Sequence, residues 1–188
     1  MDLNIEIQNA VAVLINGGTI LYPTDTVWAI GCDASNELAV QKVNNLKKQA
    51  AKLGMICLVS TDKMIHNIYK EVPDVAWQII DLADKPTTLV LDKPHNIAQN
   101  LINSDNTLAV RVIKDSFCFK LLEKFRKPIV ATTANIAGKM IPATYSEISK
   151  DILNNVDYIV NLSREKKGTP LSTIIKITLD NQVKILRK

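Results

Sequence analysis

Stretches with helical periodicity alternate with short apolar runs along most of this chain, and this order restricts the folds it can adopt. Apolar residues three and four apart predict helices at 3–16, 36–46, 62–69, 75–82, 117–125 and 146–153, the third of them capped by Asp62. Short apolar runs predict strands at 19–22, 55–59, 88–91, 108–113, 128–133, 158–162, 173–178 and 183–186. Asp180-Asn181 has the chemistry of a hairpin turn, so the last two strands are expected to be antiparallel. The order predicts an α/β (α+β) fold, a single twisted mixed sheet with helices packed on it.

Length and composition indicate one domain, residues 1–188. A chain of 188 residues with 47% hydrophobic and 22% charged residues is ordinary for a protein with a single core. No apolar stretch approaches the roughly 18 residues that cross a bilayer, so no membrane association is expected. The first residues, MDLNIEIQNA, include acids and lack the basic start of a secretory signal. We therefore expect a cytoplasmic protein.

Metal and disulfide chemistry is not expected. Cys32, Cys57 and Cys118 are odd in number and widely separated, so they are interpreted as small buried hydrophobic residues. His66 and His95 have no cysteine or histidine partner at metal-ligand spacing. No metal site built from protein side chains is therefore expected.

The segment 17–31, GGTILYPTDTVWAIG, ends a short apolar strand in hydroxyl-bearing residues. Pro23 removes a donor from the strand ladder, and Thr24 and Thr26 would point the same way on an extended segment. A ledge of hydroxyl groups outside a strand end is where open α/β sheets bind small molecules. Taken alone, the pattern is more typical of a strand followed by an ordinary turn.

Two cationic positions could face this ledge. Lys47-Lys48-Gln49 closes the second predicted helix, where cations commonly complement the helix dipole. Arg111 interrupts an otherwise apolar strand and needs a partner. That partner is either an internal carboxylate or an anionic ligand held by the planar guanidinium, and the sequence leaves both alternatives open.

Two further polar loops adjoin predicted strands. Thr133 and Asn135 would present a hydroxyl and an amide to a phosphate or a sugar, although this spacing is also common in turns. The loop 166–173, KKGTPLST, brings basic and hydroxyl groups to the start of a strand, but it is not a Walker loop. The net charge is +4, yet five acidic residues and only one lysine fall in 1–46, so the positive excess of the remainder suggests an anionic partner.

These segments, in this order, resemble the YrdC/Sua5 (TsaC) family, the threonylcarbamoyl-AMP synthases, over nearly the whole chain. Residues 22–33, YPTDTVWAIGCD, resemble the family signature YPT-[DE]-TVYGLGCD, and Arg111 lies in the position of the V-R-[VI] strand. The K-x-R element of the family falls on Lys47 and Gln49, and its S-x-N element falls on Thr133 and Asn135. The late Ser-Thr pair and the C-terminal arginine fall on Ser172-Thr173 and Arg187.

The resemblance implies a single-domain YrdC-like enzyme with a concave basic face. Members of the family make threonylcarbamoyl-adenylate and pyrophosphate from L-threonine, bicarbonate or CO2, and ATP, and the product serves the t6A modification of tRNA at adenosine 37. By resemblance, ATP would contact Lys47, Gln49, Thr133, Asn135 and Arg187. Threonine would contact Thr24, Thr26, Arg111 and Ser172, with Lys47 and Arg111 as the catalytic cations. Mg2+ would come with ATP, and a tRNA threonylcarbamoyl-transferase complex would use the product.

The chain departs from the family pattern at several positions. Gln49 and Ala50 replace an arginine and a proline, Thr133 replaces a serine, and residues 84–88, DKPTT, replace P-G-P-x-T. The missing arginine removes a bidentate phosphate contact, for which Lys48 or Lys52 could substitute only as a point charge. Two alternatives follow. One is a non-catalytic relative that binds double-stranded RNA or tRNA, and the other is a carbamoyl-transfer module like the domain found in hydrogenase-maturation carbamoyltransferases.

Overall fold

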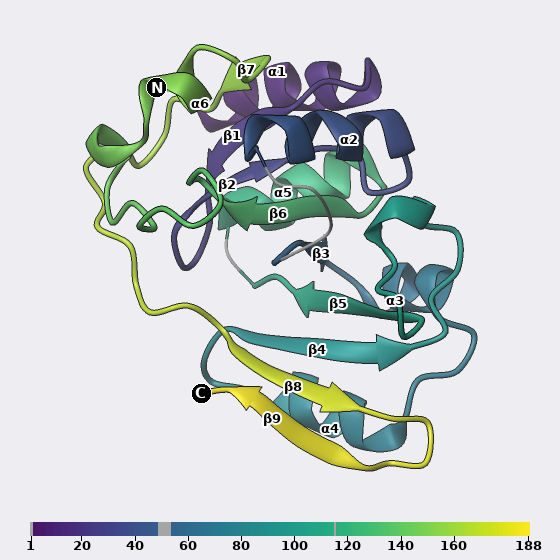
Figure 1. Ribbon diagram of the computed structural model, residues 1–188. Helices are drawn as coiled ribbons and strands as arrows, with labels where there is room; N and C mark the ends of the chain where they lie inside the picture. The colour runs from purple at the N-terminus through teal and green to yellow at the C-terminus, as the bar shows by residue number, and fades with distance from the viewer. Residues whose placement is uncertain (1, 49–53, 115) are drawn as a thin grey trace.

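Helices cover both faces of a nine-stranded mixed sheet in the part of the chain that the computed structural model describes, residues 2–48, 54–114 and 116–188 (Figure 1). The strands are β1 (Ile20–Pro23), β2 (Trp28–Gly31), β3 (Ile56–Val59), β4 (Thr87–Asp92), β5 (Thr107–Val112), β6 (Ile129–Thr133), β7 (Tyr158–Ile159), β8 (Thr173–Ile177) and β9 (Val183–Arg187). They lie side by side in the order β7-β1-β2-β6-β3-β5-β4-β8-β9. Three pairs are parallel, β1 with β7, β3 with β5 and β4 with β8, so the sheet is mixed as predicted.

The helices are α1 (Leu3–Ile15), α2 (Glu37–Leu46), α3 (Asp62–Ile68), α4 (Asp74–Leu82), α5 (Ser116–Phe125) and α6 (Lys150–Leu153). Short 3-10 turns occupy Gln99–Leu101 and Tyr145–Glu147. Side chains of α1 and α5 form one buried cluster with one face of the sheet, and side chains of α2, α3 and α4 form a second cluster with the other face. The sheet is therefore the middle layer of three.

The central strands alternate between these two clusters. On β3, Leu58 joins the cluster with α1 and α5, whereas Cys57 and Val59 join the cluster with α2 to α4. Burial on both faces explains why β3 is apolar throughout instead of alternating with polar residues. On β5, Val110 belongs to the second cluster, so its neighbour Arg111 projects from the opposite face.

One end of the sheet is less covered than the other. Figure 1 shows α1 and α5 beside β1, β2 and β6, whereas β4, β8 and β9 extend away from these helices. Every residue of β9 is exposed. The face of the sheet that carries Arg111 is thus covered by helices at one end only.

Most of the predicted elements are confirmed, with four differences. Residues 28–31 form β2, which returns antiparallel along β1, so the polar segment after β1 is the tip of a hairpin. The N-cap of α3 is Thr61 and not Asp62. The predicted helix at 146–153 is divided because Ser149 caps a new helix by accepting a hydrogen bond from the Ile152 amide. The strand expected at 158–162 is only two residues long.

Cys32, Cys57 and Cys118 are buried, as predicted, and each keeps its thiol group. Burial raises the pKa of the Cys57 thiol to about 12, so it stays protonated and unreactive at neutral pH. Among the helices of the described residues, none combines the length and the apolar character needed to cross a bilayer.

A substitution of Gly31 tests how tightly the chain packs beneath the β1–β2 hairpin. A Cβ atom built there would lie 2.2 Å from the Val130 carbonyl oxygen and 2.7 Å from Tyr22 Cε1. Because Tyr22 is fully buried and neighbouring backbone cannot yield, we expect Gly31→Ala to lower the free energy of unfolding by about 3 kcal/mol in urea titrations. The control is Gly138→Ala, whose Cβ would meet nothing within 4 Å and which carries only the cost of a positive φ, about 1 kcal/mol. Equal losses in the two variants would contradict this account of the packing.

Candidate functional site

The hairpin tip between β1 and β2 holds two threonine hydroxyl groups side by side. Thr24 Oγ1 donates to the Val27 carbonyl oxygen at 2.7 Å and accepts from the Thr26 amide at 3.1 Å. The two hydroxyl oxygens are 3.1 Å apart. Since the only hydroxyl proton of Thr24 goes to Val27, Thr26 must be the donor in this pair, and its lone pairs remain open to a ligand. The segment is a bend and not the extended ledge expected, but the hydroxyls do converge.

Arg111 has an internal partner and also an unused donor. Its side chain is only 4% exposed, and its Nη2 donates to Asp25 Oδ1 at 2.9 Å. Its Nε is buried and has no hydrogen-bond partner among the residues that the structure describes. A buried donor without an acceptor is costly, and such groups in a cavity commonly await a ligand or a water. The structure therefore supports both alternatives that the sequence left open, because Arg111 has an internal carboxylate partner and also a donor available to an anionic ligand.

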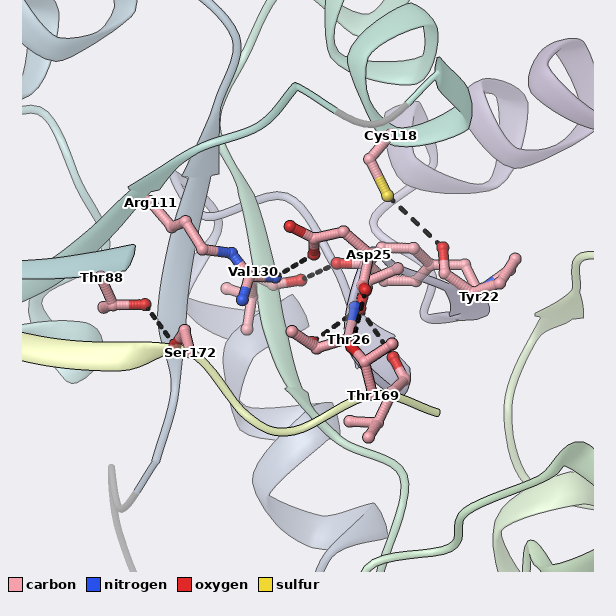
Figure 2. A network of polar contacts seen from close by, with 12 residues as sticks. Tyr22, Asp25, Thr26, Thr88, Arg111, Cys118, Val130, Thr169 and Ser172 are labelled. Carbon is pink, nitrogen blue, oxygen red and sulfur yellow. Dashed lines mark hydrogen bonds and ion pairs between the residues drawn. The ribbon is translucent and has the colours of Figure 1, made fainter. Parts of the chain in front are cut away.

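Residues 163–172 form a strap that crosses from the β7 edge of the sheet to β8 (Figure 1). The strap is attached to the hairpin tip, because the Thr169 amide donates to the Thr26 carbonyl at 2.8 Å and the Thr169 hydroxyl donates to the Asp25 carbonyl at 3.0 Å. The amide of Gly168 donates to the Ala143 carbonyl at 2.7 Å. These bonds hold the strap over the hairpin, as Figure 2 shows for Thr169.

The strap also places Ser172 near the hairpin tip. Its buried hydroxyl lies 2.8 Å from the hydroxyl of Thr88 on β4. Its carbonyl accepts two hydrogen bonds from Arg187, from Nε at 3.0 Å and from Nη2 at 2.8 Å. Burial lowers the pKa of the Arg187 guanidinium, and the positive charge of Arg111 lowers it further. The guanidinium groups of Arg111 and Arg187 therefore repel each other at this site.

These groups surround one cavity of about 100 Å³. Its polar lining includes residues from the hairpin tip, β5, the end of β6, the strap and β9, namely Thr24, Thr26, Arg111, Thr132, Thr133, Ser172 and Arg187. Apolar side chains complete it, among them Val27, Ala29, Ile56, Ala131, Leu171 and Ile174. The predicted convergence of separate strand ends holds for six of the expected residues, Thr24, Thr26, Arg111, Thr133, Ser172 and Arg187.

Lys47 and Asn135 lie beside this cavity and do not line it. Lys47 is the C-cap residue of α2, and its buried ammonium group donates to the carbonyl oxygens of Thr133 at 2.6 Å and Asn135 at 2.8 Å. A longer contact of 3.3 Å joins it to Asn135 Oδ1, which also accepts from the Thr133 hydroxyl at 2.6 Å. Lys47 thus ties α2 to the end of β6. A direct role of either residue in nucleotide binding stays a prediction.

Two expected positions, Gln49 and Lys52, lie outside the described residues. One important residue was missed by sequence reasoning, because Asp25 was seen only as part of the YPT-[DE]-T motif. An acidic residue between two threonines, together with an unpaired strand arginine, was the available signal. Within the described part of the chain, no group of three or more histidine, cysteine or acidic side chains could hold a metal ion.

The Lys47 contacts predict a specific pH dependence of stability. Burial lowers the pKa of its ammonium group to about 8, whereas an unfolded lysine titrates at about 10.4. Between these values the unfolded chain binds more protons, so the contribution of Lys47 to stability rises with pH and is lost as pH falls through about 8. From pH of about 7.5 to about 9.5, the free energy of unfolding of the wild type should gain about 1 to 2 kcal/mol over that of Lys47→Met. Urea titrations at the two pH values measure this, and parallel changes in both proteins would contradict it.

Comparisons with known proteins agree with this fold. A protein of Methanocaldococcus jannaschii is 34% identical over 174 residues, which are 92% of this chain and 80% of that protein. The Threonylcarbamoyl-AMP synthase of Idiomarina loihiensis is 30% identical over 90% of this chain and 91% of its own. The crystal structure of P. abyssi Sua5 complexed with L-threonine superposes with a TM-score of 0.80 at 26% identity, over 91% of this chain but only 50% of that one.

The family model of the Sua5, YciO and YrdC proteins, described as "Telomere recombination", matches residues 12–188. This match covers every element that lines the cavity, from β1 to β9. The chain therefore belongs to the Sua5/YciO/YrdC family.

Proposed function

We propose that this chain is an L-threonylcarbamoyl-AMP synthase, a nucleotidyltransferase that uses L-threonine, bicarbonate or CO2, and ATP, and supplies the t6A modification of tRNA. The observation that carries the proposal is the buried, unpaired Nε of Arg111 in a cavity that also contains the hydroxyls of Thr26 and Ser172. A relative named Threonylcarbamoyl-AMP synthase and a Sua5 structure with L-threonine support it.

In this proposal, the cavity holds the amino acid by its three distinctive groups. The carboxylate accepts a hydrogen bond from Arg111 Nε, which removes the penalty of an unsatisfied buried donor. The hydroxyl donates to Thr26 Oγ1, whose own proton is committed to Thr24. The methyl group contacts the apolar lining, which includes Ala29 and Ile56. A valine would leave the lone pairs of Thr26 Oγ1 without a donor, and a serine would lose about 1 to 3 kcal/mol of methyl contact.

ATP lies toward the cationic side of the cavity in this proposal. Arg187 lines the cavity, and Lys166 and Lys167 line a shallow recess next to Thr24 and Thr26. Lys47, Gln49, Thr133 and Asn135 are proposed as further nucleotide contacts, and the first of these also organises the loop after β6. The polar residues that line the cavity are cations and hydroxyls, and the nearby Asp25 is paired with Arg111. This donor set does not fit a protein-held Mg2+, so we propose that the ion arrives with the triphosphate.

The chemistry then needs positioning and charge compensation more than a general base. The neutral amine of threonine forms a bond to the carbon of CO2, one C–O π bond opens onto oxygen, and the nitrogen releases a proton to water, which gives a carbamate. A carbamate oxygen bonds to the α-phosphorus while the bond from that phosphorus to the pyrophosphate oxygen breaks. Two anions must approach each other, and nearby guanidinium and ammonium groups stabilise that approach.

The proposal predicts pyrophosphate release that requires threonine. Purified protein with ATP, bicarbonate and threonine should release pyrophosphate, and serine should support this at least tenfold less well. Arg111→Lys keeps the charge but loses the planar fork, so kcat/KM for threonine should fall at least tenfold. The matched control, Arg126→Lys, changes an exposed arginine at the end of α5 and should behave as the wild type.

A protein without threonine-dependent pyrophosphate release would contradict the proposed function. Steeply salt-dependent binding of double-stranded RNA or tRNA by such an inactive protein would instead favour the non-catalytic RNA-binding alternative. Transfer of the product to a tRNA threonylcarbamoyl-transferase complex is part of the proposal and needs that complex in a reconstituted assay.

A further inference from the structure

We infer that Asp25 is a positioning residue, which sets the affinity for threonine by holding the Arg111 guanidinium in a ligand-ready orientation. This inference rests on the proposed function and adds a residue to it. Asp25 does not line the cavity itself, whereas Arg111 does. It would therefore act through Arg111 and not by touching the substrate.

The geometry gives Asp25 this role. Its Oδ1 accepts from one nitrogen of the guanidinium, Nη2 at 2.9 Å, and Nε stays buried without a partner in the described part of the chain. A charge-assisted bond to one nitrogen sets the plane of the whole group, because the guanidinium is rigid. Without that bond, a long side chain carrying a buried charge would turn toward other acceptors. The Nε–H would then no longer be held in place for a ligand carboxylate.

Asp25 also connects Arg111 to the other walls of the cavity. Its backbone carbonyl accepts the Thr169 hydroxyl at 3.0 Å, and the adjacent Thr26 carbonyl accepts the Thr169 amide at 2.8 Å. The hairpin tip is thus joined to β5 through the Asp25 side chain and to the strap through main-chain oxygens. Figure 2 shows Asp25 between Arg111 and Thr169, with Thr26 beside it. One residue therefore keeps the guanidinium aligned with the hydroxyls of Thr26 and the strap.

Simple electrostatics predicts the opposite effect of removing Asp25, which makes the inference testable. Arg111 and Arg187 are two cations near one carboxylate, so neutralising Asp25 raises the positive potential at the cavity. If Asp25 only competed with the substrate for Arg111, Asp25→Asn would lower the KM for threonine. If Asp25 positions Arg111, the same substitution raises it.

The first experiment measures steady-state kinetics of Asp25→Asn, with thermal unfolding to verify folding. We expect the KM for threonine to rise about tenfold, since the ion pair is replaced by a weaker hydrogen bond to a neutral amide, while the KM for ATP and kcat change much less. Asp25→Glu keeps the charge on a side chain one methylene longer and should give an intermediate KM. The control Asp105→Asn breaks another ion pair, with Lys176 at 2.8 Å, and should leave the KM for threonine unchanged. An unchanged or lower KM in Asp25→Asn would overturn the inference.

The second experiment observes Arg111 directly and does not need turnover. The chain has only four arginines, so a sample labelled with 15N-arginine gives few Nε signals, and Arg111→Lys assigns the one of interest. In the wild type, we expect a sharp Arg111 Nε–H signal that is protected from hydrogen exchange. In Asp25→Asn, it should broaden and exchange faster, and Asp105→Asn should leave it unchanged.

These two measurements distinguish a failure of the proposed function from a failure of the positioning inference. An Arg111 signal that responds to Asp25→Asn in a protein without threonine-dependent pyrophosphate release would remove the proposed function but keep the positioning. An active wild type with an unaltered signal and KM in Asp25→Asn would keep the function and remove the positioning. If Asp25→Asn does not fold, Asp25→Glu decides, because a wild-type KM and a wild-type signal in that variant would also overturn the inference.

Discussion

The ion pair between Arg111 and Asp25 joins segments 86 residues apart, and the cavity forms where they meet. A guanidinium with only 4% exposure has lost most of its hydration, which a single carboxylate offsets in part. Such a group is a poor choice for stability alone, since apolar residues of similar volume often serve as well. Its presence in an otherwise apolar strand, with one nitrogen left unpaired, is more readily explained by a ligand than by the fold.

The hydroxyl groups around this ion pair already use part of their hydrogen-bonding capacity, which restricts the ligands that the cavity can bind. Thr24 gives its proton to a carbonyl, which forces Thr26 to donate to Thr24 and to accept from elsewhere. Ser172 and Thr88 share one hydrogen bond between two hydroxyls, so one proton of that pair is still available. The cavity therefore offers a defined acceptor, Thr26 Oγ1, beside a cation, together with the Ser172 hydroxyl, which either donates or accepts. An amino acid with a side-chain hydroxyl can pair with these groups at once.

The sequence predicted much of the fold because its helices and strands carry clear periodic signals. The strands β3 and β5 are continuous apolar runs buried on both faces, and capping residues such as Asp2 and Asn36 mark helix starts. The failures occur where local signals compete. Ser149 ends one helical turn and begins another, and the return of the chain along β2 depends on pairing with β1 and β6.

The candidate site was predictable as a set of residues but not as a geometry. Motif order brought Thr26, Arg111 and Ser172 together correctly, since the β1–β2 hairpin tip, β5 and the strap before β8 all reach one cavity, although β2, β5 and β8 are not neighbours in the sheet. It could not show that Lys47 is turned toward the carbonyl oxygens after β6, because this contact depends on the distance between a helix end and a loop. The role of Asp25 was equally hidden, since only tertiary structure shows which carboxylate faces a buried arginine.

The strap makes the cavity a product of the whole chain. Thr169 and Asp25 are 144 residues apart, so the hairpin wall and the strap wall of the cavity come from distant parts of the chain. Pairings of such long range form late and slowly during folding. A molecule that occupies the cavity binds only the completed chain, so its binding energy is added to the free energy of unfolding of the entire protein. Cellular pools of the occupant would thereby influence how long each copy of the protein survives proteolysis.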